Sequence, residues 1–92
     1  MGKILVIDDE RAIRRALREI LEFEEFEVDE AENGKEGLKL ATTEHYDVIF
    51  CDIKMPEMDG MEVLDGILLA KVEAPLIMIS GHGNIETAVQ AI

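Results

Sequence analysis

Three acidic side chains follow one another directly after an apolar run near the start of the chain. In the stretch "ILVIDDE", residues 4–10, four aliphatic residues lead into Asp8, Asp9 and Glu10. Carboxylates held this close repel one another, and away from water they either take up protons or bind a cation. Carboxylate oxygens are hard ligands of the kind that Mg²⁺ prefers. The stretch therefore predicts a cation site.

Two further polar residues occupy similar places later in the chain. Asp52 comes near the end of the apolar run "DVIFCDI" (47–53), and Ser80 ends the run "PLIMIS" (75–80). Mg²⁺ is commonly held by one or two carboxylates and several waters, which leaves room for a phosphoryl oxygen. A carboxylate beside the ion can attack phosphorus and form an aspartyl phosphate, and a nearby hydroxyl can hydrogen-bond the phosphoryl group. The residue types thus predict phosphoryl chemistry.

Patterns typical of strands and helices alternate along the chain and would position these residues. Continuous apolar runs predict buried strands, alternation of apolar and acidic residues predicts an edge strand, and apolar residues at helical spacing predict amphipathic helices. The expected strands cover 3–8, 26–31, 47–53 and 75–80; the expected helices cover 11–23, 35–43, the region of 63–68, and a last segment capped by Asn84 with Glu86 in its first turn. This order predicts one α/β domain with a parallel sheet covered on both faces. Such sheets bind ligands at the carboxyl ends of their strands.

Simpler explanations exist for the same residues taken singly. Asp9 could cap the helix that follows it, and Asp52 could be an acid that faces a loop. Cys51 lies within a strand and is expected to be a buried small hydrophobe rather than a nucleophile. The functional interpretation is favoured because Asp8, Asp9, Asp52 and Ser80 each fall at a strand end.

The composition indicates which kinds of binding partner are disfavoured and in which cellular compartment the protein is expected. The chain has 92 residues and a net charge of −12, which argues against binding to nucleic acid or to an anionic membrane surface. It carries one cysteine, so no disulfide can form within the chain, and it contains no apolar stretch long enough to span a membrane. A cytoplasmic protein is expected.

Three motifs resemble those of the receiver domain of two-component response regulators: "ILVIDDE", "DVIFCDIKMPEMDG" and "PLIMISGHG". The resemblance covers the whole chain, and receivers of nitrogen-regulation-type activators are the most similar. It implies a flavodoxin-like doubly wound fold with strand order 2-1-3-4-5. It implies that Asp52 is the phosphoacceptor, loaded from a phosphohistidine on a sensor histidine kinase. It further implies that Asp8 and Asp9 belong to the acidic pocket, that Asp9, Asp52 and the backbone carbonyl of Lys54 contact Mg²⁺, and that Ser80 is the switch hydroxyl.

The resemblance also identifies a difference from the family. Receivers have a fifth strand and a fifth helix, with a lysine just after that strand, whereas this sequence stops at Ile92. We therefore expect residues 1–92 to form a truncated receiver domain of four strands. Without a fifth strand, Leu76–Ile79 would form an exposed apolar edge, and such edges pair with other chains. The expectation is a homo-oligomer, most simply a two-fold dimer, that covers this edge or the bare face of the sheet.

Two other classes of function remain open from the sequence. One is a Mg²⁺-dependent phosphatase of the haloacid-dehalogenase kind, which also uses an aspartate nucleophile at a strand end. That family places its two acids two residues apart on the first strand, whereas Asp8 and Asp9 are adjacent. The other is a scaffold without chemistry that self-associates through its open edge. The expectation for the chain itself is a signalling module rather than an enzyme.

Overall fold

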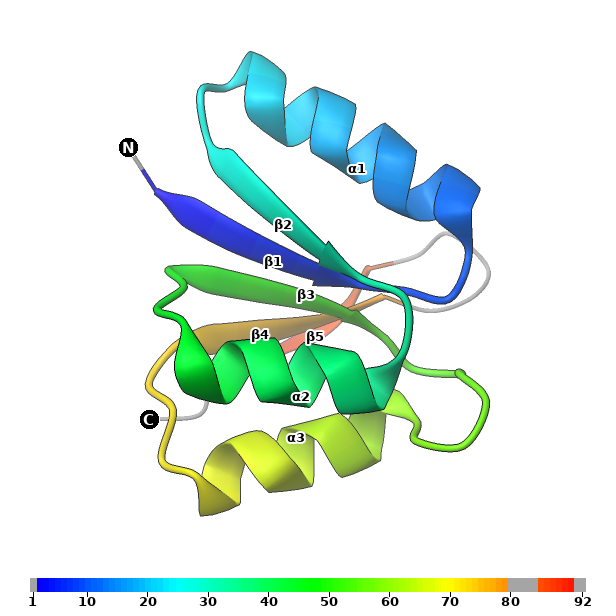
Figure 1. Ribbon diagram of the computed structural model, residues 1–92, viewed down its shortest axis with the longest axis vertical. Helices are drawn as coiled ribbons and strands as arrows, with labels where there is room; N and C mark the ends of the chain where they lie inside the picture. The colour runs from blue at the N-terminus through cyan, green and yellow to red at the C-terminus, as the bar shows by residue number, and fades with distance from the viewer. Residues whose placement is uncertain (1, 80–84, 91–92) are drawn as a thin grey trace.

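One five-stranded sheet with three helices makes up the structure, a computed structural model that describes residues 2–79 and 85–90 (Figure 1). The elements follow the order β1 (Lys3–Ile7), α1 (Arg11–Phe23), β2 (Glu27–Ala31), α2 (Gly34–Thr43), β3 (Val48–Asp52), α3 (Gly60–Leu69), β4 (Pro75–Ile79) and β5 (Ile85–Gln90). Seven of these eight elements agree in type with those expected. None of the helices in the described ranges is long and apolar enough to cross a membrane.

The strand order is β2-β1-β3-β4-β5, and the first four strands are parallel. The chain runs outward from β1 to β2 and then crosses back to β3 on the other side of β1, so the order reverses between β1 and β3. Ile7 on β1 is level with Cys51 on β3. The residues that follow these two strands therefore leave the sheet side by side, at its switch point. This confirms the doubly wound, flavodoxin-like arrangement.

The last described segment corrects two expectations. Residues 85–90 form β5, antiparallel to β4, with Leu76 level with Val89 and Ile77 level with Ala88. The helix expected after Asn84 is therefore wrong for these residues, and Asn84 itself lies outside the described residues. The β4 edge, expected to be exposed, is paired. The physical reason is that β5 has β-branched residues at alternate positions, and pairing satisfies the backbone groups of an apolar edge.

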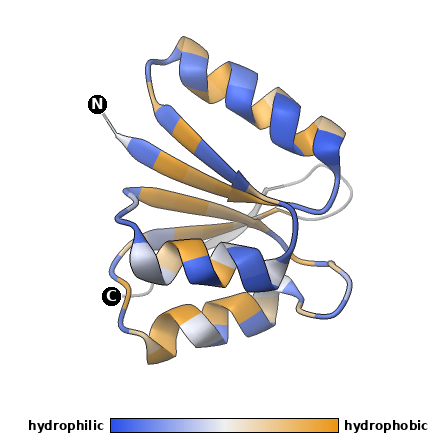
Figure 2. Ribbon diagram, in the orientation of Figure 1, coloured by the Kyte–Doolittle hydropathy of each residue, from blue (hydrophilic) through white to orange (hydrophobic). Residues whose placement is uncertain are grey.

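The two faces of the sheet are covered unequally. Helices α2 and α3 lie on one face and enclose the larger core, whose fully buried members include Leu5, Ile7, Ile49, Cys51 and Leu76. Among the described elements, helix α1 alone covers the other face, where Ile4, Val6 and Val28 are buried. Figure 2 shows hydrophobic strands at the centre and a helix α1 that alternates between hydrophobic and hydrophilic residues.

Helix α1 covers its face of the sheet only in part. None of its residues is buried, and only Leu17 and Leu21 pack against the sheet core. On the same face Val48 and Phe50 of β3 remain half-buried. A partly exposed apolar face on central strands is a surface on which another polypeptide segment can pack.

Candidate phosphoacceptor site

Three carboxylates meet at the carboxyl end of the sheet. Asp8 and Asp9 directly follow β1, and Asp52 is the last residue of the neighbouring β3. Their ligand atoms all lie within 4.8 Å of one another. The structure thus brings together three of the residues singled out in the sequence. Lys54 lies in the loop after β3, two residues from Asp52, and Ser80 lies outside the described residues.

Two of the three carboxylates are removed from water. The exposed fraction is 2% for Asp8 and 4% for Asp52, whereas Asp9 is exposed. Oδ1 of Asp52 is buried and has no hydrogen-bond partner among the described residues. A buried carboxylate oxygen without a partner is costly and favours either a proton or a cation. The donor set, three carboxylates at one point, fits a hard divalent ion open to solvent on the Asp9 side.

The crowding raises the proton affinity of both buried acids. Burial, together with the charges of Asp52, Asp9 and Glu10, raises the pKa of Asp8 to about 6, although its hydrogen bond from the amide of Glu10 acts in the opposite direction. That bond is 2.8 Å long, from the Glu10 nitrogen to Oδ1 of Asp8. Burial and the charge of Asp9 also raise the pKa of Asp52, against the effect of the Lys54 and Ile53 amides. The pocket therefore stores electrostatic repulsion near neutral pH.

The simpler interpretation of Asp9 as a helix cap is wrong. The N-cap of α1 is Glu10, and no side chain bonds the helix amides at that position. By contrast, α3 has a complete capping box, in which Asp59 accepts from the Glu62 amide at 2.9 Å and Glu62 accepts from the Asp59 amide at 3.0 Å. The carboxylate of Asp9 is therefore not committed to stabilising the helix that it precedes.

The loop after Asp52 folds back tightly against the end of β3. The amide of Gly60 donates to the carbonyl of Ile53 at 2.8 Å. A Cβ at position 60 would lie 2.5 Å from the carbonyl oxygen of Asp52 and 2.9 Å from Cα of Ile53. Only glycine permits this approach, because both neighbours are backbone atoms. The start of α3 thus fixes the main chain on which Asp52 sits.

The comparison with protein families agrees with this geometry. The family described as "Response regulator receiver domain" matches residues 4–92. The chain belongs to this family. The resemblance seen in the three motifs is thereby confirmed.

Known receiver-containing proteins resemble the chain over nearly all of its length. It is 46% identical to transcriptional regulatory protein ResD of Bacillus subtilis, covering 96% of this chain and 36% of ResD. It is 37% identical to regulatory protein AtoC of Escherichia coli, covering all of this chain and 20% of AtoC. The receiver domain described here therefore spans only about a fifth to a third of these relatives.

Solved structures give the same fold. Response regulator TrrA of Thermotoga maritima, in complex with Mg²⁺ and BeF, is 43% identical with a TM-score of 0.83, over 89% of this chain and 73% of that one. The receiver domain of the hybrid histidine kinase CckA is 34% identical with a TM-score of 0.80, over 88% and 77%. These similarities show a receiver fold.

Two residues next to the pocket of this receiver were not singled out from the sequence. Arg14 on α1 donates from Nη1 to the carbonyl oxygen of Asp8 at 2.8 Å and from Nε to Oε1 of Glu30 at 3.0 Å. Glu30 lies on β2, on the same face as Val28. The sequence contains the information needed to place Glu30. Residues two apart on a strand lie on the same face, so Glu30 must face α1 as Val28 does.

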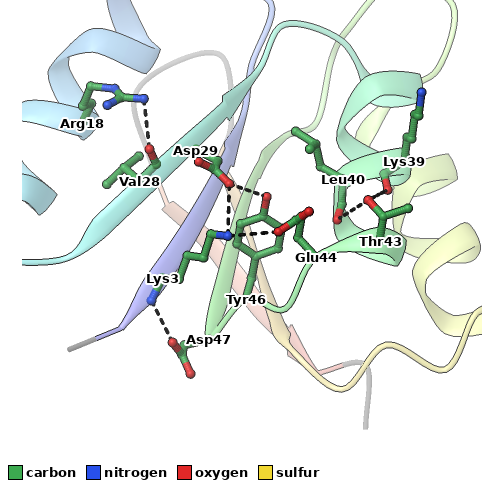
Figure 3. Close-up of polar contacts among 10 residues, drawn as sticks. All are labelled: Lys3, Arg18, Val28, Asp29, Lys39, Leu40, Thr43, Glu44, Tyr46 and Asp47. Atoms are coloured by element: carbon green, nitrogen blue, oxygen red, sulfur yellow. Dashed lines mark hydrogen bonds and ion pairs between the residues drawn. The ribbon is translucent and has the colours of Figure 1, made fainter.

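A separate polar network lies at the opposite, amino end of the receiver sheet (Figure 3). The hydroxyl of Tyr46 donates to Asp29 at 2.7 Å, and Nζ of Lys3 donates to Glu44 at 3.2 Å. Tyr46 is buried, and burial followed by its bond to Asp29 raises the pKa of its hydroxyl. This network ties β1 and β2 to the segment that leads into β3, at the end of the sheet opposite the carboxylates, so it has a structural role.

Cys51 lies beside the pocket but faces the core. Its side chain is fully buried and free, and burial together with the charge of Asp52 raises the pKa of the thiol to about 12. A thiol in this state is not a nucleophile, because the reactive form is the thiolate. The expectation of a buried small hydrophobe is confirmed.

Proposed function

We propose that this chain is a phosphoacceptor module in which Asp52 takes a phosphoryl group from a phosphohistidine on a sensor histidine kinase. The observation that carries the proposal is the convergence of Asp52 with Asp8 and Asp9, whose ligand atoms lie within 4.8 Å of one another, together with the buried Oδ1 of Asp52, which has no hydrogen-bond partner among the described residues. This arrangement supplies a nucleophile, and a place for the cation that phosphoryl transfer needs, at one strand end. The likeness to TrrA, whose structure contains Mg²⁺ and BeF, supports it.

In the proposed reaction a carboxylate oxygen of Asp52 attacks the phosphorus atom. The bond between phosphorus and the imidazole nitrogen of the donor breaks, its electron pair stays on that nitrogen, and an acyl phosphate forms on Asp52. The rigid end of β3 fixes the direction of the attacking oxygen, and burial restricts water. Mg²⁺, when bound, neutralises the carboxylates and the phosphoryl oxygens.

We assign the Mg²⁺ ligands to Asp8, Asp9, Asp52 and the backbone carbonyl of Lys54. The carboxylates are the donor set that the structure brings together. The hydroxyl of Ser80 is the proposed switch group, which bonds the phosphoryl oxygen after transfer. Residues 1–92 are proposed to act as one receiver unit, since the sheet and the acidic pocket both draw on β1 and β3.

Incubation with acetyl phosphate and Mg²⁺ tests the proposed function. We expect at most one phosphoryl group per chain, seen by intact-mass spectrometry, labile to hydroxylamine and absent when EDTA is present. Multiple turnovers that release phosphate without a labelled protein would indicate a phosphatase instead. No labelling and no hydrolysis would indicate a scaffold. We propose that the chain is a signalling module and not a turnover enzyme.

We propose that a second copy of the chain packs on the sheet face beside α1. The edge of β4 is paired with β5 and does not serve, whereas Val48 and Phe50 on this face are half-buried and α1 covers it only in part. Size-exclusion chromatography with light scattering at micromolar concentration should give a dimer, and Phe50→Ser should shift it toward the monomer. A monodisperse monomer at these concentrations would refute the proposed dimer.

We also propose a cytoplasmic location without direct contacts to nucleic acid or membrane. The single cysteine is free, which suits a reducing compartment, and the net charge of −12 opposes binding to anionic polymers and lipid surfaces.

A further inference from the structure

Arg14 connects three separate parts of the fold at one point. Its guanidinium donates from Nη1 to the carbonyl oxygen of Asp8 at 2.8 Å and from Nε to Oε1 of Glu30 at 3.0 Å. The side chain is only 12% exposed. It thus links α1 and β2 to the main chain that follows β1, which carries two of the three pocket carboxylates.

Glu30 is itself held firmly, so it can act as an anchor for Arg14. Nε of Arg18 bonds the second carboxylate oxygen of Glu30 at 2.5 Å, so both oxygens are engaged. Arg18 also donates to the carbonyl oxygen of Val28 at 3.0 Å (Figure 3). A guanidinium that spans two partners in a fixed geometry orients both, which a single point charge does not do.

We propose that Arg14 is a positioning residue for the acidic pocket: it holds the peptide of Asp8 so that the carboxylates of Asp8 and Asp9 converge on Asp52. This inference deepens the proposed function and rests on it. The amide of Asp8 is bonded to the carbonyl oxygen of Ala31 at 3.1 Å, and Arg14 supplies the matching restraint on the carbonyl side. Without Arg14 the main chain of Asp8 keeps the hydrogen bond at its amide but loses the one at its carbonyl oxygen.

The direction of the effect distinguishes positioning from simple electrostatics. Arg14 is a cation close to a cation site, so removal of its charge by itself would strengthen metal binding. Loss of a positioning contact instead weakens metal binding, because the three carboxylates no longer start from a convergent arrangement. Outer contacts that orient metal ligands typically contribute about 10- to 100-fold in affinity.

The test compares Arg14→Ala and Arg14→Lys with the matched control Arg18→Ala. Arg18 shares Glu30 with Arg14, and its own hydrogen bonds go to Glu30, Glu22 and the carbonyl oxygen of Val28 rather than to Asp8. We expect Mn²⁺ affinity, measured by titration calorimetry on the full chain, to fall about tenfold in Arg14→Ala. Arg14→Lys should also lose affinity, since lysine keeps the charge but cannot span both partners. Arg18→Ala should lose less affinity than either Arg14 variant, because Arg14 still bonds both Glu30 and the carbonyl oxygen of Asp8, although both alanine variants lower the melting temperature.

A readout without metal completes the test. The amide of Glu10 is bonded to Oδ1 of Asp8, so its hydrogen exchange in EDTA reports the order of this turn. Exchange should be faster in both Arg14 variants and less affected in Arg18→Ala. Equal or tighter Mn²⁺ binding by the Arg14 variants, or equal losses for Arg14→Lys and Arg18→Ala, would overturn the inference. If Arg14→Ala does not fold, the comparison of Arg14→Lys with Arg18→Ala decides.

Failure of the proposed function gives a different pattern. In that case the unmodified chain itself takes no phosphoryl group from acetyl phosphate, whatever the Arg14 variants do. If the unmodified chain is labelled and the Arg14 variants match it in both Mn²⁺ affinity and exchange, only the positioning role is refuted.

Discussion

Asp52→Asn should abolish labelling of the chain by acetyl phosphate, with a loss of about a thousandfold or more in rate. The amide has almost the same shape as the carboxylate, so the packing at the end of β3 is retained. It lacks the anionic oxygen that forms the bond to phosphorus. The labelled fraction over time, measured by intact-mass spectrometry in Mg²⁺, gives the rate.

Asp65→Asn provides the matched control for this experiment. It makes the same chemical change at an exposed position on α3, away from the pocket, and should be labelled at the unmodified rate. If Asp52→Asn were labelled as fast as the control, another carboxylate would be the phosphoacceptor, and the assignment of Asp52 would be withdrawn.

Asp8→Asn should stabilise the metal-free chain at alkaline pH. The pKa of Asp8 is raised from 3.8 to about 6 in the folded state, so folding favours its protonated form. The contribution of protonated Asp8 to the free energy of unfolding is fully present below about pH 4 and is lost as the pH rises through about 6. The loss amounts to about 3 kcal/mol above that range. Asparagine is neutral throughout and should remove most of this cost, which would raise the melting temperature by about 10 °C at pH 8.

Thermal unfolding in EDTA at pH 8 and at pH 4 measures the effect of Asp8→Asn. The variant should be more stable than the unmodified chain at pH 8 and nearly equal to it at pH 4. Addition of Mg²⁺ should then stabilise the variant less than the unmodified chain, because the ion relieves repulsion that the variant no longer has. A difference in stability that did not depend on pH would contradict a crowded, charged pocket.

The main part of the fold follows from local patterns that the sequence displays clearly. The strands at 3–7, 48–52 and 75–79 are short apolar runs, and the helix at 11–23 has an unambiguous helical period. A parallel sheet then places the residues after its central strands together, which is why Asp8, Asp9 and Asp52 could be grouped without coordinates. The grouping depended on topology rather than on sequence distance.

The segment 85–90 could not be assigned in the same way. "IETAVQ" is short, and its apolar residues fit either a helix or a strand, so local pattern alone does not decide between them. Pairing with the neighbouring β4 favours the strand, because it provides hydrogen-bond partners for the backbone amides and carbonyls at the edge of β4. Arg14 was missed for a related reason: its bond to the Asp8 carbonyl depends on how α1 lies against β2.

The burial of Cys51 gives the chain a chemical reporter of its own opening. The thiol is the only one present, it is fully buried in the central strand, and it is joined through one peptide bond to Asp52. Alkylating reagents react with exposed thiolate, so they can modify Cys51 only in molecules whose sheet has opened. Its rate of alkylation therefore measures the free energy of opening next to the proposed phosphoacceptor. An ion that binds only the closed pocket slows the alkylation of Cys51 in proportion to the fraction of chains that it occupies. The alkylation rate at several ion concentrations therefore gives the affinity of the pocket for that ion, with no probe attached beforehand.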